Sequence, residues 1–95
     1  MASYVIYQAD VLDPEQYEEY RQLAGPSVVA AGGRYLVRGG DVELLEGELP
    51  ASRTVVLEFP NRETLLGWYH GDYVEIRKLR EHAAKATLYV IDGVI

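Results

Sequence analysis

The feature that most constrains the fold is the order in which two hydrophobic patterns follow one another along the chain. Four stretches rich in β-branched and aromatic residues, typical of strands, occupy residues 4–10, 34–38, 54–59 and 86–91. Two stretches with apolar residues at helical spacing separate the first strand from the second and the third from the fourth. The predicted order is therefore strand, helix, strand, strand, helix, strand.

The first helix has a clear start and end. Asp13 is placed to cap it, and Pro14 suits its first position because that residue needs no hydrogen-bond donor. Gly32-Gly33 ends it, since glycine accepts the left-handed conformation that follows many helices. Pro26 lies inside the pattern and should kink the helix or split off its last turn.

The second helix is expected in two parts. Asn61, after a proline, is placed to cap the first part, and His70-Gly71 interrupts the pattern. Asp72 with Glu75 then resembles a second capping box, from which the apolar stripe continues to Ala83.

The glycines beside the second strand predict a local bend. We expect at least one of Gly33, Gly39 and Gly40 to have a positive φ, which glycine tolerates freely. Residues 41–53, which contain Gly47 and Pro50, read as an irregular hairpin arm.

This order of elements is that of the ferredoxin-like α+β fold, β-α-β-β-α-β, with a four-stranded antiparallel sheet. The 95 residues suffice for one such domain, spanning residues 1–95, and not for two.

Charge and composition exclude several classes of function. Fifteen acidic against nine basic residues give a net charge of −6, so the basic stripe that nucleic-acid binding requires is not expected. Without cysteine, the chain can form neither a disulfide nor a thiolate metal site. No apolar run is long enough to cross a membrane, and the N-terminus does not resemble a signal peptide, so we expect a cytoplasmic protein.

Alternation along the strands divides the predicted sheet into two unequal faces. The consistently apolar set suits the face that the helices cover: Val5, Tyr7, Ala9, Tyr35, Val37, Val55, Leu57, Phe59, Leu88 and Val90. The other set is mixed: Tyr4, Ile6, Gln8, Arg34, Leu36, Arg38, Val56, Glu58, Thr87, Tyr89 and Ile91.

That mixed face would expose a larger apolar patch than monomers usually tolerate, so a second copy of the chain is expected to cover it in a homodimer. Gln8, Arg38 and Glu58 would then point into a partly enclosed space between two sheets, which is typical of a small-molecule site. Alternatively, Arg38 and Glu58 only neutralise each other across neighbouring strands.

Two segments carry a family resemblance. The string GGRYLVRGG at residues 32–40 and the string VVLEFPNRETLLGWYHGDYVEIRKLR at residues 55–80 resemble domain of unknown function 1330, an uncharacterised family of the dimeric α/β-barrel superfamily. The resemblance covers nearly the whole chain and implies a dimeric α/β barrel. It implies no particular reaction, because fold alone does not determine function.

The candidate site residues follow from chemistry and expected placement. Arg38 suits the binding of an anion, and Glu58 or His70 suits proton transfer, while Gln8, Tyr69 and Tyr73 offer further polar contacts to a substrate. Each has a structural alternative: His70 as a polar helix end, and the tyrosines as packing with a hydrogen bond at the rim. The two histidines lack metal-ligand spacing, so neither a metal nor a cofactor is expected.

Three functions therefore remain open at the level of sequence. The first is a cofactor-independent enzyme acting on a small oxygenated or aromatic metabolite. The second is a module that binds or senses a small molecule without chemistry, and the third is a structural dimer. A cavity large enough for a ligand would distinguish the first two from the third.

Overall fold

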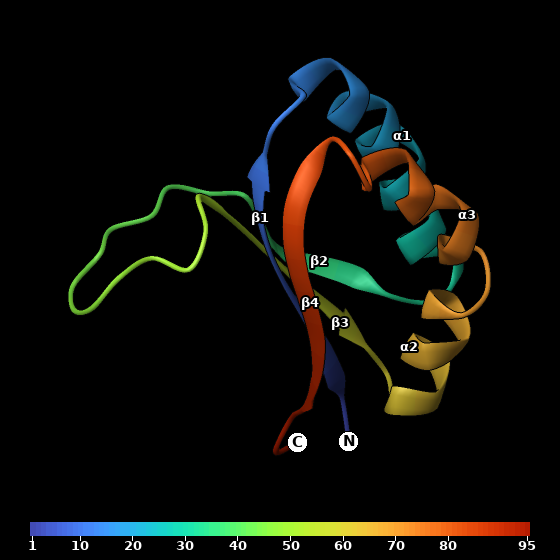
Figure 1. The fold of residues 1–95 in the computed structure, drawn as a ribbon. Coiled ribbons are helices and arrows are strands. Elements are labelled where there is room, and N and C mark those ends of the chain that lie inside the picture. Colours follow the sequence, from blue (N-terminus) through green and yellow to red (C-terminus); the bar gives the residue numbers. More distant parts are fainter.

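The computed structural model describes residues 1–95 and has the predicted order of elements. Its strands and helices are β1 (Ser3–Val11), α1 (Pro14–Ala30), β2 (Arg34–Arg38), β3 (Arg53–Phe59), α2 (Arg62–Tyr69), α3 (Tyr73–Arg77), a 3-10 turn η1 (Lys78–Arg80) and β4 (Ala84–Asp92). The four strands form one antiparallel sheet in the order β2-β3-β1-β4. All helices lie on one side of the sheet (Figure 1), which confirms the ferredoxin-like α+β fold.

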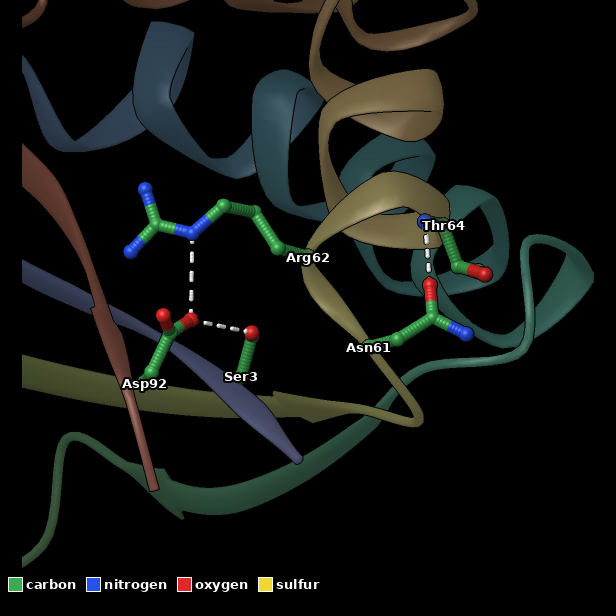
Figure 2. A network of polar contacts seen from close by, with 5 residues as sticks. All are labelled: Ser3, Asn61, Arg62, Thr64 and Asp92. Atoms are coloured by element: carbon green, nitrogen blue, oxygen red, sulfur yellow. Dashed lines mark hydrogen bonds and ion pairs between the residues drawn. The ribbon is translucent and has the colours of Figure 1, made fainter. Parts of the chain in front are cut away.

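The helix starts are as predicted, with one exception. The Asp13 carboxylate accepts a hydrogen bond from the backbone of Gln16 at 3.2 Å, and Asn61 accepts one from Thr64 at 2.7 Å (Figure 2). Asp72 makes no capping bond, so the second capping box was wrong. Its backbone is already helical (φ −58°, ψ −30°), whereas a capping residue needs an extended backbone. Pro26 does not split the first helix, since α1 runs unbroken to Ala30.

The hydrophobic core lies between the helices and the inner face of the sheet. Strand residues such as Val5, Leu57 and Phe59 meet helix residues such as Trp68 and Tyr73, and all five are almost fully buried. Several of the buried residues are tyrosines, so the core contains hydroxyl groups as well as apolar surface.

An irregularity in β2 changes which side chains face this core. Tyr35 pairs with Leu57, but Val37 pairs with Val56 and Arg38 with Val55, so Leu36 is an extra residue in a β-bulge. After the bulge the alternation is reversed, because one added residue exchanges the two faces. The predicted faces of Val37 and Arg38 were therefore wrong: Val37 lies on the outer face and Arg38 on the helix-covered face.

A bend follows β2 where the glycines predicted one. Gly39 has φ +67°, which confirms the expected positive φ, and its N–H donates to the Thr54 carbonyl at 2.9 Å. The following arm has neither helix nor strand and projects away from the body of the domain (Figure 1). It carries the exposed side chains Val42, Leu44, Leu45 and Leu49.

The outer face of the sheet has no covering layer (Figure 1). Leu36, Tyr89 and Ile91 are about half exposed there, at 47%, 48% and 51%. None of the helices combines the length and the apolarity needed to cross a membrane.

The ends of the neighbouring strands β1 and β4 are tied to the start of α2. Asp92 on β4 accepts hydrogen bonds from Ser3 on β1 at 2.7 Å and from Arg62, at the start of α2, at 3.1 Å (Figure 2). The hydrogen bond from Ser3, followed by that from Arg62, lowers the pKa of Asp92 below its usual value.

Candidate ligand-binding site

The six residues predicted from sequence do not form one cluster. Gln8 and Glu58 lie on the outer face, paired across the sheet with Thr54 and Tyr4 respectively. Arg38 and Tyr73 instead line a cavity on the helix-covered side. The expected shared face of Arg38 and Glu58 was therefore wrong, because the bulge in β2 reverses the position of Arg38.

Glu58 has partners other than Arg38. Its carboxylate accepts hydrogen bonds from Arg34 Nε at 2.7 Å and from the Tyr4 hydroxyl at 3.2 Å. These residues border an open hollow of about 560 Å³ near the chain termini. None of them lines the helix-covered cavity. The ion pair with Arg34 satisfies the charge of Glu58 on the outer face.

His70 and Tyr69 lie at the end of α2, outside this cavity. His70 is exposed and closes the helix with its backbone, and its ring stands edge-on to Tyr69 at 5.1 Å between centroids. The Tyr69 hydroxyl accepts a hydrogen bond from Arg77, whose guanidinium also lies over the Tyr69 ring. These contacts explain both residues as parts of the helix surface, and neither borders the space that Arg38 and Tyr73 line.

The cavity lies between α1 and the inner face of the sheet. Its space for a water-sized molecule is about 30 Å³, enough for about one water. Six of its 15 lining residues are aromatic: Tyr7, Tyr17, Tyr20, Tyr35, Trp68 and Tyr73. Stacking of Trp68 on Tyr73, 4.2 Å between ring centroids, fixes the side that faces the helices.

Hydroxyl groups and one arginine converge beside this cavity. Tyr73 shares a short hydrogen bond with Tyr20 and accepts another from Arg80 Nε at 3.2 Å. The Arg80 guanidinium also lies 5.1 Å from the ring centre of Tyr7, and it forms no ion pair with a carboxylate. The half-buried Arg80 guanidinium is thus held by aromatic rings and a hydroxyl rather than by a carboxylate.

Burial keeps these tyrosines protonated. It raises the pKa of Tyr20 and of Tyr7 well above the ordinary value for a phenol, and for Tyr7 the hydrogen bond shared with Tyr17 adds to the effect. For Arg80, burial acts against the charge, but the neighbouring Tyr73, Tyr20 and Tyr7 hydroxyls together outweigh it and raise the pKa. The hydroxyls of Tyr7 and Tyr20 and the guanidinium of Arg80 therefore keep their protons, and so their ability to donate hydrogen bonds, at neutral pH.

Three arginines also line the cavity. Arg21 comes from α1, Arg38 from β2 and Arg53 from β3. Arg38 lies over the ring of Tyr35 at 4.3 Å. Arg21, Tyr35 and Arg38 also border an outer groove of about 650 Å³ along α1, so these three side chains separate the groove from the cavity.

Sequence reasoning missed Arg21 and Arg53, which line the cavity, and Arg80, which lies beside it. Two of the three left a signal in the sequence. Arg80 sits within the apolar stripe of the second helical region, an unusual place for a cation facing solvent. Arg53 has the same parity as the core residues Val55 and Leu57. Arg21 is one residue from Tyr20, and no pattern distinguishes it from a surface residue. No three His, Asp, Glu or Cys side chains gather as they would around a metal ion.

Comparison with known proteins supplies the family. The sequence profile described as "Domain of unknown function (DUF1330)" matches residues 2–94. This chain is a DUF1330 protein. No protein with a curated description matches it.

Solved structures similar to this DUF1330 protein share its fold. A protein of unknown function from Rhodopseudomonas palustris has a TM-score of 0.74 and 18% sequence identity, covering 99% of this chain and 83% of that one. A protein from Nitrosomonas europaea, provisionally named an antibiotic biosynthesis monooxygenase, has a TM-score of 0.63 and 13% identity, covering 100% of both chains. At these identities the likeness is one of fold.

Proposed function

We propose that this DUF1330 protein binds a small organic molecule between α1 and the sheet. The observation that carries the proposal is the combination of six aromatic side chains with three arginines in the lining of one cavity. Arg38 and Tyr73, both predicted from sequence as binding residues, line this cavity, whereas Gln8, Glu58, Tyr69 and His70 do not.

The outer groove provides the room that the cavity lacks. The cavity alone holds about one water, but the groove next to it measures about 650 Å³ and shares Arg21, Tyr35 and Arg38 with it. A ligand whose body rests in the groove can reach the cavity once the arginine and tyrosine side chains between them turn aside. Long side chains exchange rotamers rapidly, so this opening needs no change in the backbone.

The lining favours binding over proton transfer. Each ionisable side chain of the cavity is a tyrosine or an arginine, and these donate hydrogen bonds at neutral pH. Abstraction of a proton from a substrate needs a group with a pKa near neutrality in contact with it. The non-catalytic alternative from the sequence is therefore the one that this geometry supports best.

An NMR titration tests the proposal. We expect benzyl alcohol, benzaldehyde or benzoate to shift the backbone amide signals of α1 and β2. Ala24→Leu would fill the cavity from α1 and abolish those shifts, whereas Glu19→Leu, which adds the same side chain at an exposed position of that helix, would leave them unchanged. Shifts confined to the outer face, around Ile6 and Tyr89, would contradict the proposal.

We also propose that the protein is a homodimer in which a second copy covers the outer face. Supporting this are the half-exposed Leu36, Tyr89 and Ile91, which would otherwise form an uncovered apolar patch on the sheet. Apolar side chains lie along the centre of this face, so a two-fold axis through it would pack the apolar side chains of one copy against those of the other. Its test is the state of association in solution.

A further inference from the structure

Two arginines that line the cavity, Arg38 and Arg53, form no ion pair with a carboxylate. The third arginine of the lining, Arg21, pairs with Glu18 at 3.0 Å. Elsewhere the cations divide into a paired set, Arg34, Arg62 and Lys78, and an unpaired set, Arg77, Arg80 and Lys85. The net charge is −6, so carboxylates are plentiful. Two neighbouring cations left unpaired repel each other, and a bound anion would remove that repulsion.

Glycines make room for both guanidinium groups. A side chain on Gly25 would lie 3.0 Å from an Arg38 nitrogen, and one on Gly39 would collide with the Arg53 guanidinium. Gly25 lies in the middle of α1, where glycine disfavours the helix relative to alanine. At both positions a glycine therefore leaves room for an arginine guanidinium group to lie close to the backbone.

Unsatisfied nitrogen atoms point to a missing acceptor. Arg53 Nε and Arg21 Nε are buried and have no hydrogen-bond partner. Buried donors in folded proteins normally find an acceptor, because leaving one unpaired destabilises the fold. Both side chains line the cavity, so an acceptor placed there would reach them.

We propose that the ligand is a carboxylate with an aromatic or apolar body, and that Arg38 and Arg53 bind its carboxylate with help from Arg21. The inference rests on the proposed function and names its ligand class. The planar fork of arginine matches the two oxygens of a carboxylate, and stacking on Tyr35 holds the Arg38 fork in place. The body of the ligand then lies in the outer groove that Arg21, Tyr35 and Arg38 also border, because the cavity itself has room for about one water.

The first experiment varies only the head of the ligand. Benzoate, benzyl alcohol, benzylamine and phenyl phosphate are titrated separately and followed by the amide signals of α1 and β2. We expect benzoate to bind at least about tenfold more tightly than the other three, and its affinity to fall as salt is added. Equal binding of benzoate and benzyl alcohol, or tighter binding of phenyl phosphate, overturns the carboxylate class but leaves the proposed function. If none of the four shifts these signals, the proposed function itself fails.

The second experiment varies the protein. Arg38→Gln and Arg53→Gln should each weaken benzoate binding by at least about tenfold and leave benzyl alcohol binding unchanged, because only the charged contact is lost. Arg77→Gln is the matched control, since Arg77 is half-buried but outside the cavity, and it should change neither affinity.

Gly25→Ala keeps both arginines and protects the test against a loss of folding. Alanine favours α1, so the variant should fold at least as well as the wild type. The added methyl group would press on the Arg38 guanidinium and weaken benzoate binding several-fold. Wild-type affinity for benzoate in both Gly25→Ala and Arg38→Gln would overturn the inference.

Discussion

At the scale of single residues, Tyr73 contributes both to the packing of the core and to a hydrogen-bond network within it. Its ring is 1% exposed and stacks on Trp68, and its hydroxyl bonds to Tyr20 and Arg80. A hydroxyl in such a position stabilises the fold chiefly by satisfying its neighbours, which would otherwise be buried without a partner.

Tyr73→Phe should therefore lower the free energy of unfolding by about 1–3 kcal/mol, although it removes a single oxygen atom. Denaturation by urea at neutral pH measures the effect. Tyr89→Phe is the control, because Tyr89 is half exposed on the outer face, and we expect a change within about 0.5 kcal/mol. Equal effects of the two variants would show that the buried hydroxyl network adds nothing to stability.

Buried tyrosines also predict how stability depends on pH. Burial raises the pKa of Tyr7 and Tyr20 above the unfolded value of 10.0. Their contribution is complete below that value, and it declines as the pH rises because the unfolded chain then releases protons that the folded chain keeps. The free energy of unfolding should fall between about pH 9 and about pH 11.5. A Tyr7→Phe, Tyr20→Phe double variant should show a shallower decline, and an unchanged slope would contradict this account.

At the scale of elements, sequence patterns predicted the fold well because the strands and helices differ in period. The caps at Asp13 and Asn61 were also predictable. Each side chain stands directly before a helix and accepts a hydrogen bond from the backbone N–H three residues later. Local patterns of this kind need no knowledge of the tertiary structure.

The candidate site was harder to predict because it depends on one irregular position. Tyr35, Leu36 and Val37 are all apolar, so either face of the sheet accepts each of them, and the alternation does not reveal an extra residue. The prediction for Arg38 depended on that count and failed with it. Arg80 was missed for another reason: a cation in an apolar stripe finds its place only when helix and sheet are packed together.

The two predicted capping residues of the second helical region offer a direct comparison. Asn61→Ala should destabilise the protein by about 0.5–2 kcal/mol, because the Thr64 N–H then loses its acceptor (Figure 2). Asp72→Ala should change the free energy of unfolding by less than about 0.5 kcal/mol, since Asp72 makes no capping bond. Thermal or urea unfolding of both variants measures the difference, and a larger loss for Asp72→Ala would reverse the assignment of caps.

At the scale of the whole molecule, the one-sided cover of the sheet leads to the prediction about association. Val56 lies between Ile6 and Val37 at the centre of the outer face. Val56→Asp would bury an unpaired charge in the proposed dimer and should convert it to a monomer. The wild-type interface should bury more than about 1,200 Å² in total, the lower end for a specific complex.

Sedimentation at micromolar concentration distinguishes the two states. Leu23→Asp is the control, because Leu23 is exposed on α1, on the opposite side of the sheet, and that variant should remain a dimer. A monomeric wild-type protein would contradict the proposal of a homodimer, while the helix-covered cavity would be unaffected.

The bulge in β2 has a consequence for how this protein avoids aggregation. β2 is an edge strand, and an edge normally offers a row of unpaired N–H and C=O groups on which a further chain can build. Here the extra Leu36 breaks a strand of five residues, and Gly39 bends the chain directly after it. No regular stretch longer than two residues remains on either side of the bulge. The irregularity that brings Arg38 to the cavity thus makes this edge a poor template for the growth of fibrils.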